Sequence, residues 1–299
     1  MVKRLISADT SEVAQMTPEE LKQSIKASEG RVVLSENVAT RNPWIHEVTN
    51  AEMAASFGAD LILLNGIDVL DVKIAGLLDI ENNPIQSLKR LCGRPIGVNL
   101  EPVDQSADMM EERFELEVGR TARKETFEKL NALGMDFVCL TGNPGTGVSN
   151  DAIVESVKRA KSLFDGLVFA GKMHSAGVDE PVVNLELVQR LIDAGADVIL
   201  VPSIGSVPGI TLDMVSEAVQ LCHAHGVLVM SAIGTSQESA TKETIRFFGL
   251  QNKIAGVDIQ HIGDAGYGGL APVENIYELG VAIRGLRHTV SKMTRSILR

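Results

Sequence analysis

Three short segments with one shared pattern decide the fold: GADLIL at residues 58–63, GMDFVC at 134–139 and GADVIL at 195–200. In each segment a glycine stands two positions before an aspartate, and an apolar run follows. Glycine is common just past the end of a helix because it adopts positive φ without a steric penalty. A short uninterrupted apolar run predicts a buried strand. Each segment therefore predicts the end of one helix and the start of one strand.

The same alternation extends along the whole chain. Strands are expected at 31–35, 60–65, 95–99, 136–141, 166–171, 197–202, 226–231 and 254–259. Helical patterns separate them, at 119–133, 150–164, 183–194, 212–225 and 238–250, with a last helix from about 273. Apolar strands that alternate with helices predict a parallel sheet covered by helices. Eight such units favour an α/β fold of the closed (β/α)8 TIM barrel type over the alternative, an open doubly wound sheet.

We expect residues 1–299 to form a single (β/α)8 barrel domain, with residues 1–30 as an N-terminal helical extension. The segment TPEE at 17–20 predicts the start of an extra helix there, because it combines a capping box with proline at the first helical position. Two loops, 66–83 and 100–118, are longer than most connections in such folds. The second loop is rich in Asp and Glu, which favours a solvated acidic helix slightly over a lid on the site.

The composition limits the classes of partner. The net charge of −11 argues against nucleic acid as a partner. No apolar stretch reaches the length of a bilayer or of a signal-peptide core, so we expect no membrane partner. Three widely spaced cysteines indicate reduced thiols and a cytoplasmic protein. Since barrels of this kind often self-associate, a homo-oligomer is also expected.

Polar residues follow nearly every expected strand. A barrel gathers its catalytic side chains at the carboxyl ends of its strands, so these residues predict a polar pocket without naming a reaction. They are Glu36, Asn65, Asn99, Asn143, Lys172, His174, Gln260, His261 and Asp264.

Lys172 is the strongest catalytic candidate because it directly follows the apolar run at 167–171. Burial would lower its pKa and leave a neutral amine that can form a Schiff base. Two alternatives remain: a cation that binds a substrate carboxylate or phosphate, and a structural pair with Glu36 or Asp264. Glu36 or His174 would move protons, although a hydrogen-bonded loop histidine is an equal interpretation of His174.

Two glycine-containing loops predict an anion site. The segment 263–269, GDAGYGG, contributes Gly263, Asp264, Gly266 and Gly268, and Gly234, Thr235 and Ser236 follow the preceding strand. Glycines let the backbone turn its N–H groups toward an anion. Loops after strands 7 and 8 form the phosphate site of many barrels. We therefore predict a small anionic metabolite as partner, with tight turns as the alternative role of the glycines.

A capping box of Thr235 and Glu238 is expected at the start of the helix that follows. No metal-ligand spacing such as HExxH occurs, so the metal site is unknown.

Through these two loops the chain resembles the phosphate-binding (β/α)8 (TIM) barrel superfamily. Through Lys172-Met-His174 it also distantly resembles the phosphoenolpyruvate mutase/isocitrate lyase group. The acidic metal cluster of that group and its Lys–Cys–Gly–His loop are absent here. The resemblance implies activity on small α-keto or phosphonate acids with Mg²⁺, whereas the residues themselves make no cofactor certain.

The function expected first is that of a lyase or isomerase acting on a small phosphorylated or carboxylated metabolite. Two alternatives stay open. One is a non-catalytic barrel that binds a phosphometabolite, and the other is a metal-dependent hydrolase.

Overall fold

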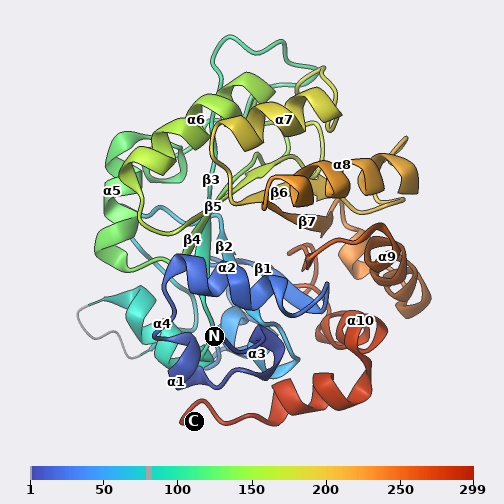
Figure 1. Ribbon diagram of the computed structural model, residues 1–299. Helices are drawn as coiled ribbons and strands as arrows, with labels where there is room; N and C mark the ends of the chain where they lie inside the picture. Colours follow the sequence, from blue (N-terminus) through green and yellow to red (C-terminus); the bar gives the residue numbers. More distant parts are fainter. Residues whose placement is uncertain (1, 79–82) are drawn as a thin grey trace.

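Eight parallel strands form a closed barrel in chain order, in which β8 pairs with β1. The computed structural model describes residues 2–78 and 83–299 (Figure 1). The strands are β1 (Val32–Val38), β2 (Leu61–Asn65), β3 (Ile96–Leu100), β4 (Phe137–Leu140), β5 (Leu167–Gly171), β6 (Val198–Pro202), β7 (Leu228–Ile233) and β8 (Ile259–Ile262). The predicted TIM barrel is confirmed.

Helices surround the barrel on its outer side (Figure 1). They are α3 (Asn50–Ser56), α4 (Pro84–Cys92), α5 (Lys124–Leu133), α6 (Asn150–Leu163), α7 (Leu185–Asp193), α8 (Leu212–Ala224), α9 (Lys242–Ala255) and α10 (Val273–Thr294). Short 3₁₀ turns lie at η2 (Val118–Arg120) and η3 (Gln237–Ser239). In the described parts of the chain, no helix has the length and apolarity needed to cross a membrane.

The N-terminal extension covers the end of the barrel at which the strands begin. It contains η1 (Leu5–Ser7), α1 (Thr10–Val13) and α2 (Pro18–Lys26), and α2 lies across the front of the barrel in Figure 1. Leu21 and Ile25 of α2 belong to the same buried cluster as the inward side chains of the strands. The extra helix predicted from Thr17 is therefore confirmed, and its apolar face plugs this end of the barrel.

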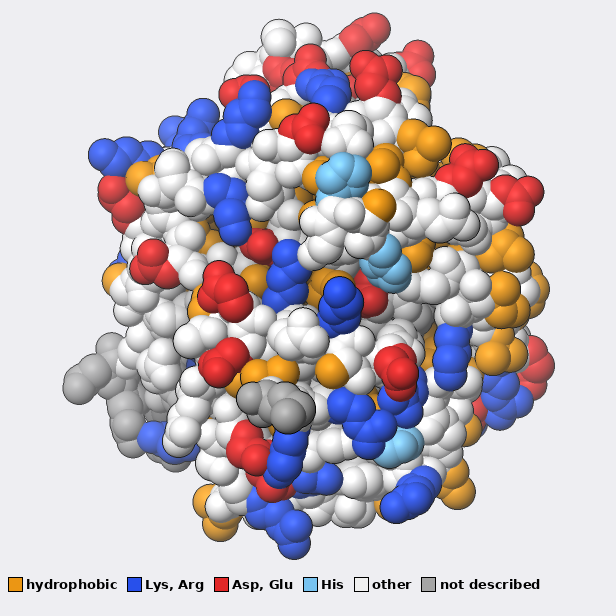
Figure 2. Space-filling view, viewed as in Figure 1, with side chains coloured by type: hydrophobic (Ala, Val, Ile, Leu, Met, Phe, Trp, Pro, Cys, Tyr) orange, Lys and Arg blue, Asp and Glu red, His pale blue; other side chains and the backbone are white. Residues whose placement is uncertain are grey.

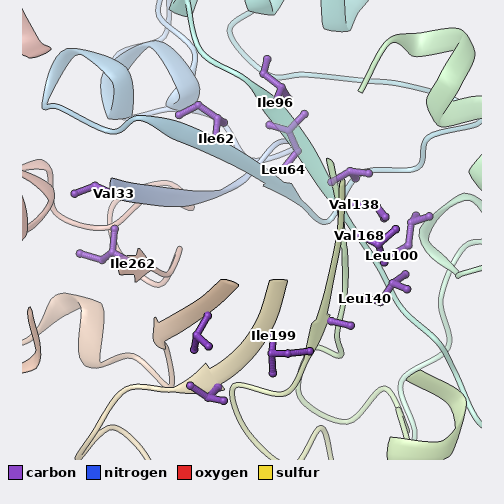
Figure 3. Close-up of a cluster of buried hydrophobic side chains, with 14 of the residues drawn as sticks. Val33, Ile62, Leu64, Ile96, Leu100, Val138, Leu140, Val168, Ile199 and Ile262 are labelled. Carbon is purple, nitrogen blue, oxygen red and sulfur yellow. The ribbon is translucent and has the colours of Figure 1, made fainter. Parts of the chain in front are cut away.

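Alternate residues of each strand face opposite sides, which gives the barrel two apolar layers. Inside, the rings of Phe137 and Phe169 stack with centroids 4.7 Å apart. Gly97 lies next to them, and a Cβ there would come within 2.2 Å of the Phe137 ring. Outside, residues such as Val33 and Ile199 pack between the strands and the helices (Figure 3). The strands are therefore buried on both faces, as their uninterrupted apolar runs predicted.

The aspartate of the recurring segment has the same role each time. Asp60, Asp136, Asp197 and Asp258 directly precede the even-numbered strands. The carboxylate of each accepts a hydrogen bond from a backbone N–H of the preceding odd-numbered strand, at 2.7–2.9 Å. The backbone N–H of each aspartate donates to the carbonyl of that same partner residue at 2.8–3.0 Å. We call this paired bond the aspartate clasp.

Two expectations about local structure are wrong. Residues 254 and 255 continue α9, which ends at Gly256 with φ 90°, so β8 starts at Ile259 and not at residue 254. The segment 101–117 contains no helix. It runs over the carboxyl ends of the strands instead, where isolated bridges join Val103 to Val148 and Met109 to Val178. The acidic residues of this loop therefore belong to a cover on the barrel mouth.

The face that carries α2 has a mixed surface. Figure 2 shows Lys, Arg, Asp and Glu side chains interspersed on it, without one large field of a single sign. Hydrophobic side chains gather at the right edge of this view, near α9, where Phe247, Leu250 and Ile254 are exposed.

Candidate functional site

Glu36 lies at the centre of the barrel mouth and is held by two neighbours. Its Oε1 accepts a hydrogen bond from Asn99 Nδ2 at 2.6 Å. Its Oε2 lies 2.9 Å from His261 Nε2. All three residues are buried and occupy inward positions of β1, β3 and β8. The structure therefore places three of the predicted strand-end residues in one hydrogen-bonded group.

A cavity of about 440 Å³ opens above this group, on the side where the strands end. Of the predicted residues, it is lined by Glu36, Asn65, Asn143, His174, Gly234, Thr235, Ser236, Gly263 and Asp264. Sequence reasoning did not assign the other lining residues to the site: Glu111, Pro144, Met173, Ser175, Gly177, Glu238 and Ala265.

A chain of amides fixes one wall of the cavity. Asn65 Nδ2 donates to Asn143 Oδ1 and to Asp264 Oδ2, both at 2.9 Å. Asn143 Nδ2 in turn donates to Glu101 Oε1 at 2.8 Å. Arg120 Nη2 donates to the same Oε1 of Glu101 at 3.0 Å, and the backbone N–H of Asn143 donates to its Oε2 at 2.9 Å. This network orients the carboxyl of Asp264 toward the cavity and occupies the carboxylate of Glu101.

Asp264 and Glu238 are acidic groups whose proton affinity is increased. Burial, followed by repulsion from Glu36, raises the pKa of Asp264 to about 7. Burial also raises the pKa of Glu238. A carboxyl with a pKa near neutrality can both release and take up a proton at physiological pH. Asp264 is therefore the titrating group best suited to proton transfer in this cavity.

His174 presents a neutral imidazole. Its Nδ1 accepts the backbone N–H of Ala176 at 3.0 Å, and burial lowers its pKa. A neutral ring whose Nδ1 accepts a hydrogen bond carries its proton on Nε2. His174 therefore offers the cavity an N–H donor.

Lys172 lies outside the cavity lining. Its side chain is 1% exposed, and Nζ lies 2.5 Å from Glu180 Oε1 and 3.3 Å from the carbonyl of Ser175. Burial lowers its pKa, against the opposing effect of Glu180. The ion pair joins the start of the β5–α7 loop to its later part. Of the alternatives weighed for Lys172, this geometry favours a structural pair, with Glu180 as its partner in place of Glu36 or Asp264.

The two glycine-containing loops have different surroundings. Thr235 and Ser236 line the cavity with φ of 56° and 66°, a backbone conformation that non-glycine residues rarely adopt. Gly266 and Gly268 instead pack against backbone: a Cβ would come within 2.1 Å of the Leu270 carbonyl oxygen or 2.6 Å of that of Asn42. These two glycines allow the loop to pack closely on itself and on the β1–α3 loop.

Glu238 does not form the expected capping box with Thr235. Its Oε1 accepts the backbone N–H of Ala265 at 2.7 Å and so joins the β7 and β8 loops across the cavity. Gln260 lies at an outward position of β8, beside Ser231 in the register, and does not line the cavity. Inward and outward positions alternate along a strand, so the one-residue step from His261 to Gln260 places the latter under the helices.

The donor set does not fit a metal ion held by the protein alone. Within residues 2–78 and 83–299, no three His, Cys, Asp or Glu side chains are arranged to ligate one. The oxygens of Glu36 and Glu101 already accept hydrogen bonds from amides, a histidine and an arginine. We therefore assign no step of the chemistry to Mg²⁺.

Comparison with solved structures shows a shared barrel. The phosphoenolpyruvate phosphomutase from Streptomyces platensis subsp. rosaceus is 13% identical over 82% of this chain and 80% of its own, with a TM-score of 0.50. A 2,3-dimethylmalate lyase of the PEP mutase/isocitrate lyase superfamily is 15% identical over 83% and 81%, with a TM-score of 0.49. The phosphomutase confirms the distant resemblance in fold that the sequence predicted.

A third barrel carries a different activity. A thiamine phosphate pyrophosphorylase from Pyrococcus furiosus is 15% identical over 86% of this chain and 97% of its own, with a TM-score of 0.49. At such identities the similarity shows the fold alone. A search of the curated proteins finds no match. The family model described as "Domain of unknown function (DUF7916)" matches residues 6–299, so the chain belongs to this family.

Proposed function

We propose that the protein is a lyase or isomerase that moves a proton to or from a small phosphorylated or carboxylated metabolite bound in the mouth cavity. One observation carries this proposal: Asp264 lines the cavity, is oriented by Asn65 at 2.9 Å, and has its pKa raised to about 7. General acid–base catalysis is most efficient when the pKa of the group lies near the working pH.

The other residues would support this proton transfer. The ionised carboxyl of Asp264 removes a proton from carbon or oxygen of the substrate and returns it at a neighbouring atom or to the leaving group. The Nε2–H of His174 is suited to donate to an oxygen on which negative charge develops. Glu36 adds negative potential behind the site, which keeps the proton affinity of Asp264 high, whereas its partner His261 acts in the opposite direction.

The anion of the substrate would bind at the rim formed by Gly234, Thr235 and Ser236. The left-handed backbone of Thr235 and Ser236 supports this, because strained loop conformations cluster at ligand sites. Lys172 would act by holding the β5–α7 loop through Glu180. The covalent alternative predicts that borohydride labels Lys172 in the presence of keto acids, and we expect no label.

Deuterium exchange tests the proposal directly. The protein is incubated in D₂O and EDTA with a panel of keto, hydroxy, amino and phospho acids, and ¹H NMR follows loss of substrate C–H signals and formation of products. We expect Asp264→Asn to lower the rate by about 100-fold or more, in the range that general acid–base groups contribute. The matched control is Asp165→Asn, at an exposed position after α6.

Each alternative function gives a different result. Full exchange in Asp264→Asn would refute the proposal. Thermal stabilisation by a phosphometabolite without exchange or product would favour the non-catalytic barrel. Activity that appears only when EDTA is replaced by Mg²⁺, Mn²⁺ or Zn²⁺ would favour the metal-dependent hydrolase.

A further inference from the structure

We propose that the mouth cavity recognises its ligand through a protonated amine, so that the metabolite is an amino compound. This inference rests on the site proposed above and adds the chemical class of the group that it binds. The cavity is lined by four acidic residues: Glu36, Glu111, Glu238 and Asp264. Of the described residues, none that lines the cavity is Lys or Arg.

Glu238 contributes a buried carboxylate oxygen to the proposed ammonium site. Glu238 is 2% exposed and lines the cavity. Its Oε1 is held by the backbone N–H of Ala265, whereas its Oε2 is buried and has no hydrogen-bond partner among the residues described. A buried carboxylate oxygen without a hydrogen-bond donor lowers the stability of the folded protein, so such an oxygen normally binds a ligand or water. An ammonium group has three donors and no acceptor, which matches a site with free carboxylate oxygens.

Two cations near the barrel mouth, Lys172 and Arg120, are already paired with carboxylates outside the lining. Lys172 is paired with Glu180 at 2.5 Å, and Arg120 is paired with Glu101 at 3.0 Å. A cationic ligand would relieve the mutual repulsion of the lining carboxylates, whereas an anion alone would add to it. The raised pKa values of Asp264 and Glu238 have the same origin, because both respond to burial and to neighbouring carboxylates.

A substrate with both an ammonium group and an anionic group would complement both parts of the cavity. Its ammonium would lie among Glu36, Glu238 and Asp264, and its carboxylate or phosphate would face the Thr235–Ser236 rim. Both sets of residues line the same cavity of about 440 Å³, which is large enough for a small metabolite.

Three probes of similar size separate charge from shape: n-butylammonium, 1-butanol and butyrate. Binding is measured by ligand-observed NMR at pH 8 in EDTA. We expect n-butylammonium to bind at least about tenfold more tightly than either of the others, since a charge-assisted hydrogen bond is much stronger than a neutral one. Glu238→Gln should weaken the ammonium probe about tenfold, while Glu217→Gln, at an exposed position of α8, should have no effect.

Two variants keep the test decisive. The side-chain amide oxygen introduced by Glu238→Gln can still accept the N–H of Ala265, and thermal unfolding shows whether this variant is folded. Glu111→Gln changes an exposed residue of the lining and should weaken the ammonium probe about two- to fivefold without affecting the fold. Tighter binding of butyrate than of n-butylammonium would overturn the inference, and so would equal affinities in wild type and both folded variants.

The result is separable from the proposed function. Butylammonium has no carbonyl and no leaving group, so its binding does not depend on turnover. If n-butylammonium binds but no exchange that depends on Asp264 is found, the proposed proton-transfer function is refuted and the amine site is not. Exchange that depends on Asp264, with preference for butyrate, would refute the amine site alone.

Discussion

Replacing Asp264 with asparagine should stabilise the protein at neutral and alkaline pH. The folded structure raises the pKa of Asp264 from 3.8 to about 7, chiefly through burial and repulsion by Glu36. Ionising this carboxyl in the folded protein is therefore unfavourable. Asparagine is close in size, carries no charge, and its Oδ1 can still accept the 2.9 Å hydrogen bond from Asn65.

The sign and size of the effect follow from the two pKa values. Well below the ordinary pKa of 3.8 the carboxyl is protonated in both states, and the charge makes no difference to stability. As the pH rises from about 4 to about 7, the unfolded chain loses its proton first, so the wild type loses stability. A difference of about three pKa units corresponds to about 4 kcal/mol. Because Glu238 is one of the carboxylates that raise the pKa of Asp264, the two groups titrate together, and we expect the free energy of unfolding of Asp264→Asn to exceed that of wild type by about 2–4 kcal/mol above about pH 7.

Urea unfolding followed by circular dichroism, at steps from about pH 4.5 to about pH 8.5, measures this difference. Asp165→Asn, at an exposed position, is the control for loss of one carboxylate. A difference between wild type and Asp264→Asn that stays constant with pH, or that grows toward acid, would refute the electrostatic account of the site. The same variant should lack exchange activity, so stability and activity would change in opposite directions.

Three further perturbations address the scaffold and Lys172. Arg284 Nη1 lies 2.5 Å from the buried carboxylate of Asp60 and compensates part of its charge. Arg284→Met removes this compensation and should lower the free energy of unfolding by about 3–5 kcal/mol. Gly97→Ala should cost about 1–3 kcal/mol or more, because its Cβ would meet the ring of Phe137 at 2.2 Å. Adding Phe137→Leu should recover part of that loss, and strict additivity in the double-mutant cycle would contradict the clash. Lys172→Met should lower the melting temperature while Kd for n-butylammonium stays within about twofold, and a change of about tenfold would place Lys172 in the site.

The barrel could be predicted because its signals are local and repeated. A glycine that ends a helix, an aspartate and an apolar run together mark the start of a strand, and three such segments are clear in the sequence. The fourth, Gly256-Val-Asp258, is obscured because Ile254 and Ala255 extend the apolar run backward into α9. Hydrophobicity alone cannot separate the last turn of a helix from the first residues of a strand. The glycine at φ 90° marks the boundary.

The site was predicted in part. Strand-end position and side-chain polarity predicted that Glu36, Asn99 and His261 gather at the barrel mouth, because carboxyl ends of parallel strands meet at one end of a barrel. In the structure Asn99 and His261 both contact the carboxylate of Glu36, and their role in ligand binding stays a prediction. The direction of a side chain on a loop is not fixed by such a rule. Lys172 turns to Glu180, eight residues later, and Glu238 turns across to Ala265 instead of capping a helix. Neither contact follows from a helix or strand periodicity, because both depend on the path that a loop takes in the folded chain.

The aspartate clasp divides the barrel into four successive pairs of strands. Asp60, Asp136, Asp197 and Asp258 each bind the odd-numbered strand just before their own, so every clasp lies within a pair and none joins one pair to the next. Each βαβ pair therefore fixes the register of its own two strands through a clasp that does not involve the next pair. For circular permutation or half-barrel exchange, the best sites for new termini are therefore the connections β2–β3, β4–β5 and β6–β7. Opening the chain at these connections leaves all four aspartate clasps intact.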